Sequence, residues 1–201
     1  MQQPAKLNYK VYQGSTFQET YRWESQTKVY VPIQTISKSA PCVITTQTPT
    51  DLPVGWRFRV TGAGGMKEIN TLSEDNYYIA TYINQSKTQV TINQINSSSY
   101  TTYTSGGILE YNDWINLAPY NARMQIRETI DSPVVIYEAS SAGGQIVLDN
   151  THKTIILTIP ASVTSGFVFE TAVYSMELFK QTGEVTSFIE GNLVLVKEVT
   201  R

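Results

Sequence analysis

The sequence predicts an all-β protein, and three observations support that prediction. Helical periodicity is almost absent from the 201 residues. Apolar and polar residues instead alternate with a period of two, which is typical of strands that bury one face. Turn signals rich in Gly, Asn and Asp interrupt these runs at short spacing, as at residues 62–65 and 105–107. Many short strands separated by such turns are typical of a sandwich or a small barrel.

The expected strands are defined by alternation and by residue type. In residues 55–60 the apolar side chains face one way, and Arg57 and Arg59 face the other. Residues 174–178 alternate in the same way, whereas residues 192–197 are expected to form a more fully buried strand. β-branched and aromatic residues dominate the other expected strands, which are 9–12, 16–23, 33–37, 42–46, 77–83, 89–93, 122–127, 134–138, 146–148 and 154–159. The one helix-like piece, residues 161–169, is expected to form a single turn at most.

The composition changes along the chain in a way that predicts two domains. Residues 32–110 are dense in Thr, Ser, Asn and Gln, whereas the flanking strands are more apolar. The borders of this stretch, Val31-Pro32 and residues 107–113, have the character of linkers. We therefore predict a discontinuous host domain, residues 1–31 and 111–201, with a second β domain, residues 32–110, inserted into one of its loops. Insertion at an exposed loop costs little closure entropy.

Charge and composition exclude several classes of function. Charged residues make up 16% of the chain and the net charge is -2, against about 25% charged residues in an average domain. No Lys/Arg cluster supplies the basic face that nucleic acid needs, so we expect no nucleic-acid partner. No apolar run approaches the roughly 18 residues that span a bilayer, and the start lacks a signal peptide. We expect synthesis in the host cytoplasm and no membrane insertion.

The residue types that carry catalysis are scarce. Cys42 is the one cysteine and lies in an apolar strand start with no cation beside it, so we expect a buried structural thiol. His152 is the one histidine and lies in a polar turn, and no Gly-x-Ser-x-Gly elbow accompanies it. We expect no catalytic residue, no cofactor and no metal. The enzymatic alternative is a polysaccharide depolymerase that uses carboxylates, which occur in pairs at Glu74-Asp75 and Glu110/Asp113.

Tyrosines of the insert are the remaining candidate functional residues. Aromatic rings among Asn and Gln side chains form surfaces that bind sugars or proteins. Half or more of these tyrosines are expected to belong to the core or to a strand face instead. The predicted interaction surface comprises Tyr77, Tyr82, Tyr100 and Tyr103, together with Arg57 and Arg59.

The insert resembles a small β module of bacteriophage structural proteins, which is named after the first catalytic-cysteine half-domain of ubiquitin-activating enzymes. The matching segments are residues 36–46, 52–60, 65–70, 77–80 and 95–107. The adenylation and thioester machinery of those enzymes has no counterpart in this sequence, so catalysis is not carried over to Cys42. The resemblance implies a compact, barrel-like spacer or adhesive module.

The host segments resemble a domain of phage tail and baseplate proteins, including the N-terminal part of upper baseplate proteins. The matching segments are residues 13–17, 21–23, 116–127, 174–178, 183–186, 190–191 and 198–201. Pro119 stands where that family often has Gly. The resemblance implies an immunoglobulin-like sandwich that docks onto other virion parts.

The two resemblances together predict a non-enzymatic structural component of a tailed bacteriophage virion. It would belong to the tail, the baseplate or a collar or neck adaptor, or it would decorate the capsid surface. The expected partners are other virion proteins and copies of the chain itself. The alternative is a receptor- or glycan-binding module that uses the Tyr/Asn-rich insert. Because the sequence stops at Arg201 after its last expected strand, we expect no fibre or receptor-binding head other than the insert.

Overall fold

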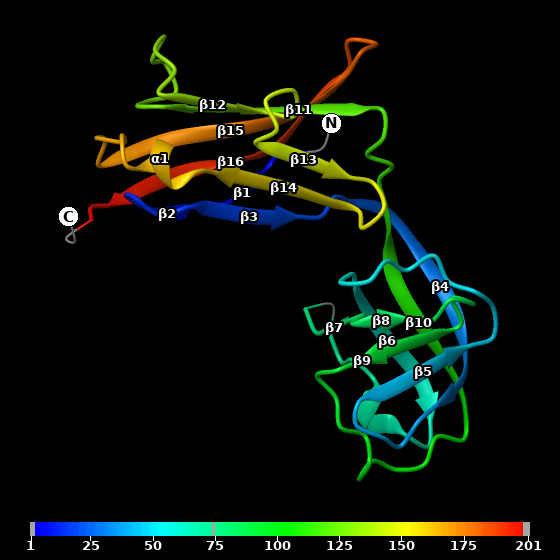
Figure 1. Ribbon diagram of the computed structural model, residues 1–201. Coiled ribbons are helices and arrows are strands. Elements are labelled where there is room, and N and C mark those ends of the chain that lie inside the picture. The colour runs from blue at the N-terminus through cyan, green and yellow to red at the C-terminus, as the bar shows by residue number, and fades with distance from the viewer. Residues whose placement is uncertain (1–2, 74, 199–201) are drawn as a thin grey trace. The chain divides into compact units, whose positions relative to one another are not determined.

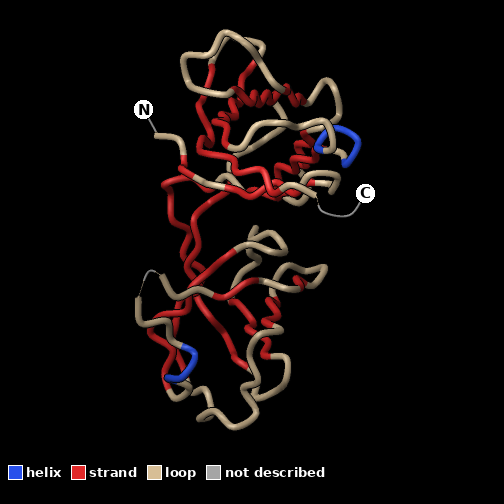
Figure 2. Tube along the Cα trace, turned by 90° about the vertical axis from the view of Figure 1, so that its left-hand side faces the viewer, coloured by secondary structure: helices blue, strands red, loops and turns tan. Residues whose placement is uncertain are grey.

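The computed structural model describes residues 3–73 and 75–198 and confirms the all-β prediction. Strands make up 51% of it, and the α-helix α1 (Ala161–Thr164) is the single turn expected from the sequence. A 3₁₀ turn, η1 (Lys67–Ile69), is the other helical segment among the described residues, and both are blue in Figure 2. The chain forms two compact units, unit 1 up to Trp23 and from Asn116 onward, and unit 2 from Glu24 to Ile115.

Unit 1 contains two sheets (Figure 1). The larger sheet has the order β1 (Ala5–Lys6), β16 (Val185–Val196), β15 (Thr171–Lys180), β11 (Tyr120–Arg127) and β12 (Tyr137–Ser140), and β2 (Tyr9–Tyr12) also pairs with β16. The smaller sheet has the order β13 (Ile146–Asp149), β14 (Thr154–Ile159) and β3 (Phe17–Tyr21). Aromatic rings join the two sheets: the ring centroids of Tyr21 in β3 and Phe188 in β16 lie 6.1 Å apart.

The core of unit 1 follows from the alternation of its strands. Met176 of β15 pairs with Met124 of β11, and both are buried. Their neighbours two residues away point to the same face, so Tyr174 and Leu178 are buried as well. The alternation predicted for residues 174–178 is therefore confirmed. The facing side chains come from β14, where Ile155, Leu157 and Ile159 are each at most 1% exposed.

Unit 2 is one antiparallel sheet that curls into a half-barrel. Its strand order is β7 (Tyr78–Ile79), β6 (Arg57–Gly64), β10 (Ser105–Trp114), β4 (Glu24–Ile36), β5 (Cys42–Thr46), β9 (Gln89–Ile92) and β8 (Tyr82–Ile83). Residues 78–83 connect the two edges of this sheet. Tyr78 pairs with Phe58 at one edge and Tyr82 with Thr91 at the other, and the Ala80 amide between them donates to the Trp56 carbonyl.

The core of unit 2 lies on the concave face of the curled sheet. Trp56 and Phe58 are at most 1% exposed, and the Trp56 indole nitrogen donates to the Asn112 carbonyl at 2.8 Å. The inward and outward sides predicted for residues 55–60 are confirmed. Cys42 is fully buried in this core, as expected, and burial raises the pKa of its thiol.

The two stretches expected to be linkers are strands, and that expectation is wrong. Val31-Pro32 lies in β4 and residues 107–113 lie in β10, and these strands pair from Glu24 with Trp114 to Pro32 with Ile108. The proline lacks an N–H but keeps its carbonyl, which accepts a hydrogen bond from the Gln47 amide. Unit 2 consequently encloses the predicted insert, residues 32–110, and extends beyond it at both ends.

Three expected strands also differ in detail. Residues 77–83 form two short strands rather than one, because the segment pairs with different partners at its two ends. The strand expected at residues 134–138 is displaced to Tyr137–Ser140, and residues 134–136 are exposed. Residues 192–197 are not fully buried, since Val194 is 42% exposed and β16 covers the core with one face only.

Candidate interaction site

A polar recess of about 260 Å³ lies on the outer face of unit 2, over β4, β6 and β10. Its position follows from the alternation of these strands. Because Phe58 and Tyr111 point into the core, the residues beside them in the chain point outward. Two side chains from each strand carry the charged and amide groups of the recess, namely Glu24, Lys28, Arg57, Arg59, Glu110 and Asn112.

Hydrogen bonds hold two carboxylates of the recess in place. The Nε and Nη2 atoms of Arg57 both donate to the Glu24 carboxylate at 2.7 Å, and the Asn112 amide donates to it at 3.0 Å. Lys28 donates to Glu110 at 2.7 Å, and these two residues also form an ion pair. The side chains of Glu24 and Glu110 are only 15% and 13% exposed. The hydrogen bond from Arg57 to Glu24 also raises the pKa of the guanidinium, which stays charged.

Tyr77 forms the border of the recess, and Arg57 fixes its ring. The Arg57 guanidinium carbon lies 5.5 Å from the ring centroid, within the range of a cation–π contact. The guanidinium is itself held by Glu24, so its orientation over the ring is defined. Tyr77 remains 48% exposed and presents aromatic surface to solvent.

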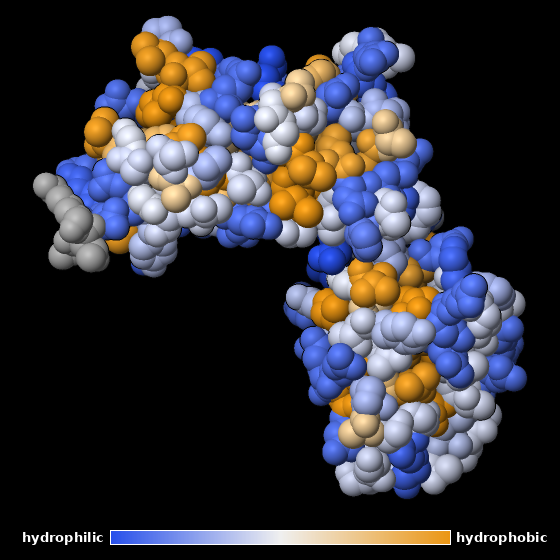
Figure 3. All heavy atoms as spheres, viewed as in Figure 1, coloured by the Kyte–Doolittle hydropathy of each residue, from blue (hydrophilic) through white to orange (hydrophobic). Residues whose placement is uncertain are grey.

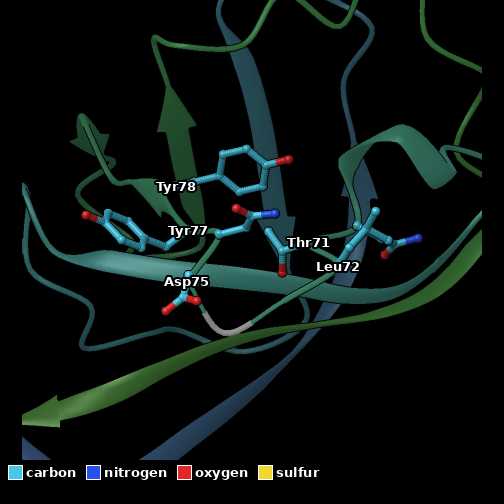
Figure 4. A pocket seen from close by; sticks show the side chains of 7 residues that line it. Thr71, Leu72, Asp75, Tyr77 and Tyr78 are labelled. Atoms are coloured by element: carbon cyan, nitrogen blue, oxygen red, sulfur yellow. The ribbon is translucent and has the colours of Figure 1, made fainter.

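A second recess, of about 440 Å³, adjoins the first and shares Asp75 and Tyr77 with it. Figure 4 shows the rings of Tyr77 and Tyr78 pointing to opposite sides of the backbone. The Tyr78 hydroxyl donates to the Ile69 carbonyl at 3.0 Å, which anchors this ring against the unit. Asn70, Thr71, Leu72 and Asn76 complete the lining. Glu74, which the sequence pairs with Asp75, lies outside the described residues.

The structure brings three of the six predicted interaction residues together. Arg57, Arg59 and Tyr77 all line the first recess. Tyr82 is exposed on β8 and lines neither recess. The remaining two, Tyr100 and Tyr103, are half-buried and pack against the core of unit 2, and burial raises the pKa of Tyr103.

Sequence reasoning named the carboxylates of Asp75 and Glu110 but did not place them beside the arginines, and it missed Glu24. Glu24 and Glu110 belong to strands that pair over a separation of about 80 residues, and Glu110 lies in one of the expected linkers. The signal that could have found these strands is the alternation at residues 28–31 and 109–112, where Leu109 and Tyr111 flank Glu110.

His152 and the carboxylates of the described residues do not form a metal site. His152 lies in an exposed turn, as expected, and its Nδ1 atom is 2.6 Å from an Asp149 oxygen. Hydrogen bonds from His152 lower the pKa of Asp149. Among residues 3–73 and 75–198, no group of His, Cys, Asp and Glu side chains could hold a metal ion. No helix in these ranges is long and apolar enough to cross a membrane.

Unit 1 carries a second surface feature, an aliphatic patch formed by Ile130, Val134, Val135 and Ile136. These side chains are 84%, 67%, 36% and 37% exposed. They lie in the connection between β11 and β12, where Figure 3 shows hydrophobic residues in orange. The Arg127 guanidinium donates to the Ser132 carbonyl and so attaches this connection to the sheet.

No protein-family model matches the chain, and no curated protein matches its sequence. The function is therefore inferred from the recesses of unit 2, the aliphatic patch of unit 1 and the sequence resemblances.

Proposed function

We propose that the protein is a non-enzymatic structural component of a tailed bacteriophage virion. Its place would be the tail, the baseplate, a collar or neck adaptor, or the surface of the particle. Unit 1 would be an immunoglobulin-like sandwich that docks onto other virion proteins, and unit 2 a small barrel-like module. The resemblances of residues 36–107 and of the host segments to phage proteins support the assignment to a virion.

The aliphatic patch is the observation that carries the docking role. Exposed aliphatic side chains gain free energy only when a partner removes them from water, and contiguous groups of them mark interaction sites. Asp131 is the one charged residue between Ile130 and Ile136, and residues 132–137 contain none. Charged residues are depleted at the centre of protein interfaces. The adjoining strand β12 lies at the edge of the larger sheet. This end of unit 1 therefore offers an apolar contact beside a sheet edge.

Repeated docking would follow from the symmetry of a virion. Virion substructures are rings or shells of identical subunits, so one docking contact is repeated around the particle. Several copies of the chain are expected in each particle, in contact with other virion proteins or with each other.

The test is incorporation into particles. Mass spectrometry of virions from the phage that encodes this chain should detect the protein in several copies. In a complementation assay, the double variant Ile130→Ser/Val134→Ser should be lost from purified particles. The matched control Val147→Ser/Val185→Ser changes exposed valines elsewhere in unit 1, which are 49% and 58% exposed, and should be incorporated normally.

Two results would contradict the proposal in different ways. Absence of the unmodified chain from virions would reject the structural role itself. Equal incorporation of both double variants would reject the aliphatic patch as the docking surface.

A further inference from the structure

The geometry points to a saccharide site in unit 2: we infer that the two adjoining recesses around Tyr77 bind an uncharged oligosaccharide. This binding would be an activity of unit 2 beyond the docking of unit 1, and it does not depend on that docking. The site combines the exposed aromatic ring of Tyr77, carboxylates held by hydrogen bonds, and the polar side chains of Asp75 and Asn76.

The charge balance of the recess selects an uncharged ligand. Three cationic side chains, Lys28, Arg57 and Arg59, line it with three acidic ones, Glu24, Asp75 and Glu110. Arg57 is bound to Glu24 through two hydrogen bonds, and Lys28 is bound to Glu110. An anionic ligand would have to displace a carboxylate that is already paired, and a cationic ligand would meet these same cations. A neutral polar ligand has neither cost.

The polar groups suit a ligand that is rich in hydroxyls. A hydroxyl both donates and accepts hydrogen bonds, so it needs acceptors and donors side by side. The Asn70 amide is held by two hydrogen bonds to the Ala63 backbone. Asp75 supplies exposed acceptor oxygens, and the exposed Asn76 supplies an amide that donates and accepts. Neighbouring hydroxyls of a sugar ring can therefore bind a carboxylate and an amide at once.

The aromatic border suits the apolar face of a sugar ring. Tyr77 is held by Arg57 through the contact to its ring, so little conformational entropy is lost when a ligand packs on the exposed part. Leu72, which is 91% exposed, adds apolar surface to the second recess. The volume of about 440 Å³ for this recess lies within the range of roughly 300–1,000 Å³ that is usual for small-molecule sites.

The experiment begins with the full chain on an array of immobilised neutral and acidic oligosaccharides. A soluble neutral oligosaccharide that binds is then titrated into isotope-labelled protein and followed by NMR. The amide signals of residues 70–72 and 75–78 should shift, whereas those of unit 1 should not.

Two tyrosine variants test the site directly. Tyr77→Ala should weaken binding about tenfold or more, because it removes the aromatic surface. Tyr82→Ala is the matched control, since Tyr82 is an exposed tyrosine of the same unit outside both recesses, and it should bind like the unmodified chain. Unchanged signal dispersion in both variants would show that each one folds.

Three results would overturn the inference. The first is no binding of any neutral oligosaccharide at concentrations of about 1 mM. The second is a preference for acidic oligosaccharides, and the third is an equal loss of binding in the Tyr77 and Tyr82 variants. All three leave the incorporation test of unit 1 unaffected, so the failure of one proposal is distinguishable from the failure of the other.

Discussion

The two units expose different kinds of hydrophobic side chain. Unit 1 exposes mostly aliphatic residues, including Ile130, Val134 and Val168 at 84%, 67% and 87%. Among the large hydrophobic residues that unit 2 exposes, tyrosines predominate, namely Tyr30, Tyr77 and Tyr82 at 59%, 48% and 58%.

This difference indicates different uses of the two surfaces. An aliphatic side chain gains free energy only by leaving water, which suits a lasting contact with another protein. A tyrosine offers an apolar ring and a polar hydroxyl, so it tolerates solvent and also contacts polar ligands. The aliphatic surface of unit 1 agrees with its proposed docking role, and the exposed tyrosines of unit 2 agree with the proposed binding of a polar ligand.

The units also build their cores differently. In unit 1 both sheets contribute buried residues, Met124 and Met176 from one sheet and Leu157 from the other. In unit 2 a single curled sheet surrounds the core, and Trp56 fills its centre. The stability of each unit can therefore be tested by truncating a residue of its own core.

The largest effect is expected from truncating one core at a time. Trp56→Ala should destabilise unit 2 by about 3–5 kcal/mol, and Met124→Ala should destabilise unit 1 by about 2–5 kcal/mol. Both residues are at most 2% exposed. Hydrogen exchange read by mass spectrometry should show lost protection in residues 24–115 for the first variant and in strands such as β11 and β15 for the second. Equal loss in both units after either change would show that the cores unfold together.

A smaller effect is expected at a close approach of two backbone segments in unit 1. A Cβ on Gly191 would lie 1.8 Å from the Leu7 carbonyl oxygen, so Gly191→Ala has to displace β1 and β2 from β16. The cost should be about 1–3 kcal/mol, as for other overpacked sites. Chemical denaturation measures it, and Gly166→Ala is the control because its nearest neighbour would lie at 3.5 Å. Equal stability of the two variants would mean that the edge strands adjust without cost.

The difference between the two surfaces should appear as a change in the binding of a hydrophobic dye rather than in stability. Ile130→Ser/Val134→Ser should change the free energy of unfolding by less than about 0.5 kcal/mol per site. The same change should reduce the binding of a hydrophobic dye to the folded protein, because it removes exposed aliphatic surface. Tyr30→Ser/Tyr82→Ser in unit 2 should reduce dye binding less. A larger loss of dye binding in the tyrosine variant than in the aliphatic variant would contradict this difference between the two surfaces.

The smallest effect concerns one surface carboxylate in each unit. Hydrogen bonds from His152 hold the pKa of Asp149 below its ordinary value, and the Thr101 amide and hydroxyl do the same for Glu68. A lowered pKa means that each carboxylate stabilises the fold above its unfolded pKa, and that this contribution is lost as the pH falls through the folded pKa.

NMR titration of the two carboxylates should show this separately for each unit. His152→Ala should raise the pKa of Asp149 only, since it removes the side-chain hydrogen bond that is the largest cause of the lowered pKa. Thr101→Val should raise the pKa of Glu68 by a smaller amount, because the backbone amide that is the main cause remains. An Asp149 pKa that is unchanged without the imidazole would contradict the assigned cause.

The sequence by itself determined the all-β class, the single helical turn, the outward side of Arg57 and Arg59, and the burial of Cys42. These follow from local alternation and residue type, which act between neighbours in the chain. The sequence also predicted that Arg57, Arg59 and Tyr77 form part of an interaction surface, and the structure places these three around one recess.

Only the tertiary structure decided that residues 24–32 and 107–114 are paired strands. Their Pro, Gly, Asn and Asp residues are typical of turns, and local propensity could not show that pairing across about 80 residues satisfies their backbone groups. That same pairing brings Glu24 and Glu110 beside the arginines of β6 and turns a charged strand face into a neutral recess. It also decided that Tyr100 and Tyr103 face the core, because the direction of a side chain in a loop depends on what the loop packs against.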